Sequence, residues 1–341
     1  MEQYLSTVDE VLRSGVYKPN RTGVDTIAGF AKQYTIDLDD GYPLLTTKKM
    51  DGFRWKSMLH EFFWYLSGEA HIRTLREHTG IWDEWADEAG QLDTAYGRFW
   101  RRYPIPTKAE QLPGERWVDS DDSCVTVENN GDERRLTFDQ LQYVIETLQS
   151  DPHSRRMVVS AWHPANAARS TLPPCHYTFV FSVQGDRLNL HLTQRSADLA
   201  LGVPFNIACY SLLLTVMAQQ SGYEPGTFSH TLVDAHVYCG TGERGAWYDN
   251  NLSELQGRLK AVDDRSDYRS IRAWIEQSAP AESSANDGAD HVPGLLKQLS
   301  REPLSRPTLE VADKPLDSLS FDDVSVRDYE SYDGIRFAVA E

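Results

Sequence analysis

Hydrophobic residues recur along this 341-residue chain with two different periods, and each period predicts a different kind of element. Spacings of three and four residues predict amphipathic helices. They occur near the N-terminus, at Tyr4, Leu5, Val8, Val11 and Leu12, and again over residues 57–66, where Gly68 ends the pattern. Strict alternation at Leu188, Leu190 and Leu192 predicts a strand with one buried face.

The same patterns extend over most of the chain. Strand-like runs cover Met157–Trp162, Tyr177–Val183, Leu188–Thr193 and Leu232–Tyr238, and shorter helices are expected near 138–149 and Leu295. Ile207–Gln220 is apolar nearly all round, which predicts a long, buried central helix. Helices and strands alternate without a regular βαβ rhythm and without an internal repeat. We therefore predict an α/β fold of the α+β type, with a mixed sheet packed by helices.

Two stretches depart from these patterns. Residues 104–136 are polar, acidic and rich in turn residues, so we interpret them as an insertion or a long excursion. Residues 241–290 are also polar, and they end in SAPAESSANDGAD, a composition typical of disordered segments.

Composition narrows the class of protein. No run of eighteen apolar residues occurs, so no membrane span is expected, and the N-terminus lacks the basic start and apolar block of a signal peptide. Four widely spaced cysteines suit neither a zinc site nor a disulfide scaffold. These features favour a cytoplasmic protein.

The charge is strongly negative. A formal net charge of −17 argues against general nucleic-acid binding. Only nine of the 34 basic residues are Lys. An excess of carboxylates with few lysines is typical of a protein adapted to high salt, because salt screens the self-repulsion. The alternative is an ordinary acidic cytoplasmic protein.

The densest group of polar side chains lies in residues 194–208, QRSADLALGVPFNIA. Its donors favour an anionic ligand. The chain has no Walker A loop and no Gly-x-Gly-x-x-Gly, so arginines would have to hold a phosphate; Arg21, Arg155, Arg156 and Arg195 are the candidates. His60-Glu61 begins like a zinc-protease motif, but Trp64 stands where the second ligand belongs, so no metal is expected.

Two further residues have alternative interpretations. Cys175 follows Pro173-Pro174 and precedes His176, so it could be a nucleophile activated by the arginines or a small core thiol. Glu61 lies at the edge of an apolar helix face. It could be an acid–base group with a raised pKa or a partly exposed helix carboxylate.

Six motifs together resemble the folate-dependent thymidylate synthases that use a cysteine nucleophile. They are PNRTG, IWDEWAD, SRR, LPPCH, QRSADLALGVPFNIA and DAHVY, in the order of that family. The resemblance covers most of 1–101, 138–240 and 291–341. It implies a single catalytic domain over 1–341, with insertions at about 104–136 and 241–290.

The resemblance implies reductive methylation of dUMP to dTMP, with 5,10-methylenetetrahydrofolate as one-carbon and hydride donor and no metal. It implies that Cys175 attacks the uracil ring, that Glu61 moves protons, that Tyr96 takes part in a later proton abstraction, and that Asn206 and Asp198 complete the catalytic set. The implied dUMP-binding residues are Arg21, Arg155, Arg156, His176, Gln194, Arg195, Ser196, Asn206, His236 and Tyr238. The implied folate-binding residues are Lys48, Trp82, Asp198, Gly202 and Ala340.

The resemblance also implies a two-fold homodimer whose interface is a face of the sheet. Arg155 and Arg156 would then serve the site of the other subunit. Gly202-Val203-Pro204 is expected to form a turn that places Asn206 against the base.

The C-terminus departs from the family pattern of Pro-Val-Ala and an apolar residue. Ala338 replaces Pro, and Glu341 adds a charge, so closure of the site could be weaker or salt-dependent. Two rival functions remain from sequence: a pyrimidine nucleotide hydroxymethylase, which Asn206 and Trp82 disfavour, and a catalytically silent nucleotide- or RNA-binding homologue, which the retained residues and the charge disfavour.

Overall fold

The computed structural model describes residues 1–20, 23–107, 110–114, 121–130, 133–281 and 289–339. Most of the disorder-like tract predicted at 278–290 therefore lies outside the described residues, as do Arg21 and Ala340.

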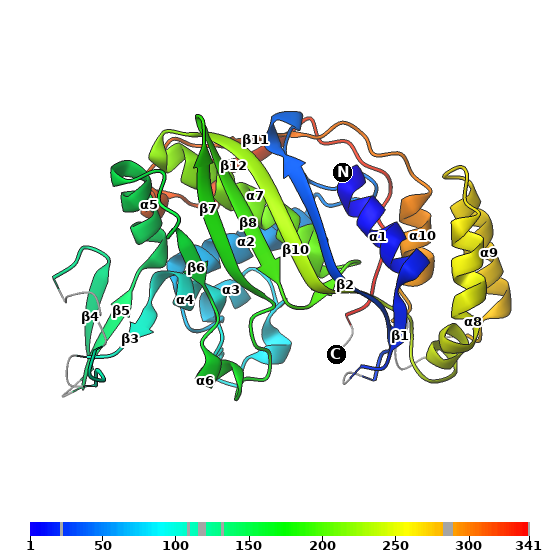
Figure 1. Ribbon diagram of the computed structural model, residues 1–341, viewed down its shortest axis with the longest axis horizontal. Coiled ribbons are helices and arrows are strands. Elements are labelled where there is room, and N and C mark those ends of the chain that lie inside the picture. Colours follow the sequence, from blue (N-terminus) through cyan, green and yellow to red (C-terminus); the bar gives the residue numbers. More distant parts are fainter. Residues whose placement is uncertain (21–22, 108–109, 115–120, 131–132, 282–288, 340–341) are drawn as a thin grey trace.

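A mixed β-sheet forms the centre of the molecule, as the sequence predicts (Figure 1). Its strands run in the order β1-β2-β10-β8-β7-β6, and β9 pairs with β10 beyond the end of β8. Strand β10 is parallel to β8 and β9, and the other pairs are antiparallel. The strands are β1 (Val16–Lys18), β2 (Thr26–Asp37), β6 (Val158–Ser160), β7 (His176–Gln184), β8 (Arg187–Gln194), β9 (Ala197–Asp198) and β10 (Glu224–Tyr238).

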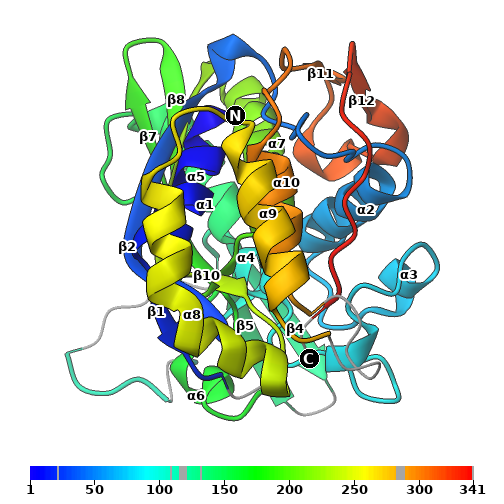
Figure 2. The ribbon, with the colours of Figure 1, turned by 90° about the vertical axis from the view of Figure 1, so that its right-hand side faces the viewer.

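Helices cover one face of this sheet and leave the other open (Figures 1 and 2). The covering helices are α2 (Phe53–Ser67), α4 (Tyr96–Arg101), α5 (Gln140–Ser150) and α7 (Gly202–Ser221). On the open face, side chains such as Val180, His191 and Thr231 are only half-buried. At the edges, Phe30 of β2 is 81% exposed. The predicted fold class is confirmed, whereas the dimer interface stays a prediction.

The first two helices follow their sequence patterns. In α1 (Glu2–Ser14), all five predicted apolar positions are buried, and the helix packs beside β2. In α2, the apolar residues that define the predicted helix face are buried, except for Phe63, which is partly buried. Gly68 ends α2 with φ 68°, a left-handed conformation that glycine adopts without strain.

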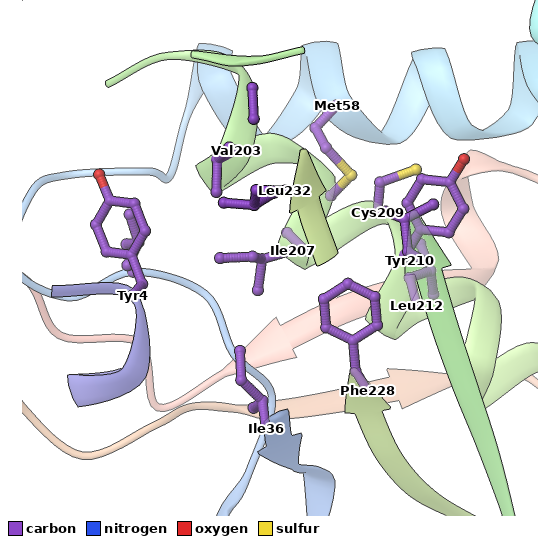
Figure 3. Close-up of a cluster of buried hydrophobic side chains, with 14 of the residues drawn as sticks. Tyr4, Ile36, Met58, Val203, Ile207, Cys209, Tyr210, Leu212, Phe228 and Leu232 are labelled. Atoms are coloured by element: carbon purple, nitrogen blue, oxygen red, sulfur yellow. The ribbon is translucent and has the colours of Figure 1, made fainter. Parts of the chain in front are cut away.

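Helix α7 is the buried central helix that the sequence predicts (Figure 3). Ile207 and Tyr210 pack against Phe228 and Leu232 of β10 in the core. The helix is long and apolar enough to cross a membrane, but most of its surface is buried inside the molecule, as in a core helix. Its start corrects one prediction. Residues 202–204 form the first helical turn and not a separate turn, because Pro is tolerated where no intrahelical N–H bond is required.

The segment 104–136 is more ordered than its composition suggests. Strands β3 (Tyr103–Ile105), β4 (Val125–Asn130) and β5 (Glu133–Phe138) form a separate sheet in the order β3-β5-β4. One face of this sheet is apolar, because Val125 pairs with Phe138 and Val127 with Leu136, but each strand contributes only two such positions, too few to stand out from the polar residues around them. The prediction that this segment is an insertion stays untested.

The segment 241–290 contains two helices that the sequence analysis did not predict, α8 (Gly242–Lys260) and α9 (Asp267–Ser278). Helix α8 packs on α1 and β1, and α9 packs on α10 (Val292–Leu299) (Figure 2). The two ends of the segment meet, because Cys239 and Asp290 form an isolated β-bridge. That this segment is an insertion stays a prediction.

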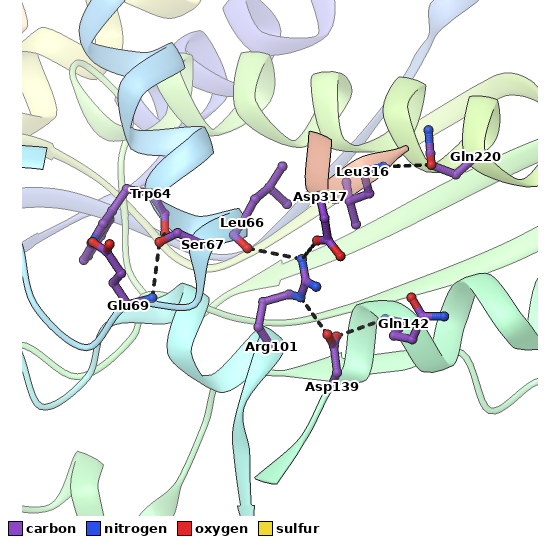
Figure 4. Close-up of polar contacts among 10 residues, drawn as sticks. All are labelled: Trp64, Leu66, Ser67, Glu69, Arg101, Asp139, Gln142, Gln220, Leu316 and Asp317. Atoms are coloured by element: carbon purple, nitrogen blue, oxygen red, sulfur yellow. Dashed lines mark hydrogen bonds and ion pairs between the residues drawn. The ribbon is translucent and has the colours of Figure 1, made fainter. Parts of the chain in front are cut away.

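Arg101 links three parts of the covering layer (Figure 4). Its guanidinium donates to Asp139, the N-cap of α5, at 2.8 Å, to Asp317 at 2.7 Å and to the carbonyl of Leu66 at 3.2 Å. The remaining short elements are η1 (Leu38–Asp40), α3 (Arg73–Arg76), η2 (Asp83–Trp85), α6 (Pro164–Ala167), β11 (Thr308–Val311), η4 (Leu316–Ser318), η5 (Phe321–Asp323) and β12 (Val324–Arg327).

Candidate active site

The predicted nucleophile lies at the start of a strand beside an arginine. Cys175 immediately precedes β7 and is half-buried, whereas Cys124, Cys209 and Cys239 are buried. Arg195 follows β8, and its Nη2 lies 3.6 Å from the Cys175 Sγ. A guanidinium at this distance favours the thiolate over the thiol.

The position of Arg195 is fixed by backbone groups. Its side chain donates to the carbonyls of Pro173 at 2.6 Å and Pro174 at 3.0 Å, and its own N–H donates to the carbonyl of Cys175 at 2.8 Å. The two prolines restrict the chain that carries these carbonyls. The cation is thus held against the sulfur by groups that cannot easily move.

An aromatic cluster lies beneath the cysteine. The Tyr96 hydroxyl accepts the N–H of Cys175 at 2.7 Å, and its ring stacks on His176 with centroids 3.9 Å apart. His176 is buried and contacts the Tyr210 hydroxyl at 2.6 Å. Burial lowers the pKa of His176 to about 3 and raises the pKa of Tyr96 well above its usual value. Both rings are therefore neutral at physiological pH.

Glu61 of α2 approaches the same cluster. Its Oε1 accepts the Tyr65 hydroxyl at 2.8 Å and the Trp82 Nε1–H at 2.7 Å. Burial raises the pKa of Glu61, and these two hydrogen bonds only partly offset the effect. The carboxyl can therefore hold a proton nearer to neutral pH than an exposed glutamate can, as an acid–base group requires.

A glycine explains how α2 and α4 come together here. A Cβ on Gly97 would lie 2.0 Å from the carbonyl oxygen of Tyr65, so only glycine permits this approach. The contact brings the Tyr65 and Tyr96 rings to 5.5 Å and the Trp82 and Tyr96 rings to 5.7 Å. Glu61 and Cys175 thus belong to one cluster.

Gln194 and Ser196 lie next to Arg195 but differ in exposure. Gln194 is buried, donates to the carbonyl of Ser196 at 2.9 Å and lies 3.0 Å from the ring of His230. The Gln194 amide thus fixes the backbone that follows β8. The Ser196 side chain, in contrast, is half-exposed.

Asp198 and Asn206 lie on either side of the start of α7. Asp198 accepts the N–H of Ala200 at 2.8 Å and that of Leu201 at 3.3 Å. Burial raises its pKa, but the side chains of His291 and His236 outweigh burial, so the net pKa is lowered and the carboxylate is charged. A Cβ on Gly202 would lie 3.8 Å from the Asn206 Oδ1, so glycine keeps this space open. The Asn206 amide forms no hydrogen bond with the described residues, so it remains available to a ligand.

His236 and Tyr238 end β10 beside Asp198. His236 pairs with Asp198 across β9 and β10, and its ring lies 5.1 Å from that of Tyr238. The Nδ1 of His236 contacts Asp234 at 3.1 Å. This contact, with the ion pair to Lys18, lowers the pKa of Asp234 to about 2, although burial opposes it.

The sequence analysis missed His291, which connects several of these groups. Its Nε2 contacts the carbonyl of Ala338 at 2.8 Å, and its Nδ1 lies 3.8 Å from the Asp198 carboxylate. Its backbone N–H donates to Tyr238 at 2.9 Å, and its ring is fully buried. No local pattern identifies this residue, because its partners lie 47 to 93 positions away along the chain.

Lys48 is buried and not on the surface, where a folate tail would run. Its Nζ donates to the carbonyl of Ala200 at 2.5 Å and lies 4.9 Å from the ring centre of Phe337. Burial lowers its pKa to about 7, and Asp198 opposes the shift. Lys48 thus braces the loop after Asp198 against the C-terminal segment.

Arg155 and Arg156 are exposed and distant from Cys175 in the same chain. Val158 pairs with Val180 in the antiparallel register of β6 and β7, so Arg156 lies beside the far end of β7. About seven residues separate that end from Cys175, or roughly 23 Å along a strand. These two arginines do not reach the site of their own chain.

Arg21 and Ala340 lie outside the described residues. In the described part of the chain, no group of three or more His, Cys, Asp or Glu side chains is arranged to hold a metal ion.

Comparison with known proteins gives two findings. The family model for thymidylate synthase matches residues 2–341. A curated relative from Haloferax volcanii, described as thymidylate synthase, is 62% identical over 334 residues, which are 98% of this chain and 95% of the relative.

Proposed function

The chain belongs to the thymidylate synthase family, whose members methylate dUMP to dTMP with methylenetetrahydrofolate, and from this premise we propose which of its residues perform each part of the reaction. The observation that carries the proposal is the fixed guanidinium of Arg195 beside the half-buried sulfur of Cys175.

The Cys175 thiolate adds to carbon 6 of the uracil ring, which converts carbon 5 into a nucleophile. Methylenetetrahydrofolate, when bound, supplies the one-carbon unit and the hydride and leaves as dihydrofolate. Arg195 keeps the sulfur ionised, and Tyr96 orients it through the N–H of Cys175. When the ring is released, carbon 6 loses its bond to sulfur and the thiolate returns.

Glu61 and Tyr96 transfer the protons of the reaction. Glu61 gives a proton to the uracil carbonyl oxygen as carbon 6 is attacked and takes it back on release, which its raised pKa favours. Tyr96 takes part in the removal of the proton from carbon 5. Because its pKa is raised, it acts as a neutral hydroxyl that relays the proton and not as a phenolate.

Recognition of dUMP is divided among three groups of residues. Asn206 pairs with the uracil edge, because an amide offers both a donor and an acceptor. His236 and Tyr238 bind the sugar hydroxyl. Arg21, Arg195 and Ser196 bind the phosphate, with Gln194 and His176 holding the strand ends that carry them.

Arg155 and Arg156 complete the phosphate site from a second subunit. The open sheet face is the interface of this homodimer, and exposed apolar residues such as Phe30 and Val158 lie on its outer strands. The register of β6 and β7 supports this arrangement, because it separates both arginines from the cysteine of their own chain.

The folate lies on the side of Asp198 and Gly202, and Trp82 contacts the folate ring. Ala340 belongs to the C-terminal segment, which closes over the site. Lys48 would meet the glutamate tail only if the Phe337 segment moves, because its Nζ is now enclosed.

We also propose a reducing, salt-rich cytoplasm as the setting. None of the four cysteines forms a disulfide, and acidic residues exceed basic ones by 51 to 34. Melting temperature should rise with KCl, since salt screens the self-repulsion. Undiminished stability in dilute buffer would contradict adaptation to salt.

The central proposal is tested by Cys175→Ala. Incubation with dUMP and methylenetetrahydrofolate should give the dUMP-dependent rise in dihydrofolate absorbance only with the intact cysteine. Cys124→Ala is the matched control, because it removes a buried thiol that contacts Glu146 away from the site. Full turnover by Cys175→Ala would refute the proposal.

A further inference from the structure

A cavity of about 410 Å³ lies between α9, α10 and the C-terminal segment, away from Cys175. Arg269 and Arg272 of α9 line it together with Lys297 of α10 and Arg301, while Glu276 is its acidic lining residue. Figure 2 shows α9 and α10 side by side, with the C-terminal segment passing along α10. Four basic side chains against one acidic side chain give the lining a formal charge of +3 on a chain of net charge −17.

Internal ion pairs do not account for these cations. Arg272 pairs with Glu276 at 2.8 Å, but its Nε–H is buried and has no hydrogen-bond partner among the described residues. Among the described residues, the side chains of Arg269 and Lys297 form neither an ion pair nor a hydrogen bond. Four cations beside a single lining carboxylate, that of Glu276, repel one another, and a buried donor without an acceptor costs free energy.

The fourth cation is fixed in place. Arg301 donates to the carbonyls of Thr47 at 2.7 Å and Asp333 at 2.9 Å, and its guanidinium lies 5.2 Å from the ring centre of Tyr332. The carboxylate of Asp333 also acts on Arg301 electrostatically. The lining therefore combines a guanidinium held by backbone carbonyls, that of Arg301, with the side-chain donors of Arg269 and Lys297.

We propose that this cavity binds a small polyanion, a molecule with two or more phosphate or carboxylate groups. The volume falls within the range of small-molecule sites, and arginine forks suit oxyanions of either kind. Two of the four cations, Arg269 and Arg272, come from α9, so the segment 241–290 supplies a binding function that is separate from the transfer of the methyl group.

The test is thermal denaturation at constant ionic strength with saturating dUMP, which occupies the phosphate site near Arg195. Tripolyphosphate and tri-γ-glutamate are the two probes, and they distinguish a phosphate ligand from a carboxylate ligand. At least one should raise the melting temperature saturably. Arg269→Gln/Lys297→Gln should weaken its binding about tenfold or more, the factor expected for one lost charge-assisted hydrogen bond.

Lys260→Gln/Arg327→Gln is the matched control, because it removes the same charge from exposed positions outside the cavity. This variant should bind the probe as the unchanged protein does. The proposal is overturned if neither probe gives a saturable shift, or if both double variants weaken binding equally.

Discussion

The proposed nucleotide end and the proposed folate end of the site are built in different ways. At the nucleotide end, Cys175 and Arg195 lie on neighbouring strand ends and are joined through backbone carbonyls. At the folate end, Asp198 and Lys48 are joined to His291 and the C-terminal segment through side chains that are far apart in sequence. The first arrangement is rigid in the absence of ligand. The second depends on where the C-terminal segment lies.

The largest expected effect is that of Arg195→Ala at the rigid end. Loss of the guanidinium removes both the charge beside the thiolate and a phosphate ligand, so kcat/KM should fall about 100-fold or more. Iodoacetamide should also alkylate Cys175 more slowly at neutral pH, because a smaller fraction of the thiol is ionised without the guanidinium.

Arg187→Ala is the control for this change, because Arg187 begins the same strand and pairs with Asp37 outside the site. If thiol reactivity were the same in both variants, Arg195 would have no role in ionising the cysteine.

Asn206→Asp should alter base preference at the same end. A carboxylate offers only acceptors, which suit the amino group of cytosine and not the N–H and carbonyl of uracil. The ratio of kcat/KM for dUMP to that for dCMP should fall by roughly tenfold or more. Competition assays with both nucleotides measure it, and Asn250→Asp on α8 controls for the added charge. An unchanged preference would count against pairing by Asn206.

His291→Ala tests the folate end. It removes the contacts to Asp198 and Ala338, so KM for the folate should rise about tenfold while the Kd of dUMP changes little. His291→Gln should recover part of the loss, since an amide can still donate to the Ala338 carbonyl.

His230→Ala is the matched variant at the nucleotide end, because His230 is equally buried and contacts Gln194. It should affect dUMP binding more than folate binding. Equal effects of the two histidine variants on both ligands would mean that the two ends are not independent.

The smallest effect concerns Lys48 and pH. The folded-state pKa of Lys48 is lowered to about 7 from an ordinary value near 10.5. Between these values the unfolded chain holds a proton that the folded protein has released, so rising pH favours the folded state. The free energy of unfolding of the unchanged protein, relative to Lys48→Met, should therefore increase from pH 7 to pH 10. Urea denaturation at intermediate pH values measures it, and parallel pH profiles would contradict the buried position of Lys48.

The sequence predicts those elements in which apolar residues recur with the same spacing as the buried positions. Helix α7 and strand β8 have this property, and both were predicted within a few residues. Strand β2 was missed because its period is interrupted. Ala31 has φ 54°, and residues 26–28 are all buried whereas burial alternates only around Tyr34 and Ile36, so no simple alternation runs through the strand.

Helices α8 and α9 were missed for another reason. Their buried residues keep a helical spacing, as at Tyr268, Ile271 and Ile275, but few apolar residues surround them. At the site, Cys175 and Arg195 could be predicted because each lies within a short motif of distinctive chemistry. His291 and the enclosure of Lys48 could not, since tertiary packing alone creates both.

The bridge between Cys239 and Asp290 holds the two ends of the segment 241–290 side by side. Because these ends are adjacent, the entropy of closing the loop depends only weakly on its length. Shortening or lengthening the segment should therefore leave the strands on either side of the bridge in place. The buried pair of Arg244 and Asp290 would be the first contact that such a change must preserve or replace, because either partner left alone would be a buried, uncompensated charge.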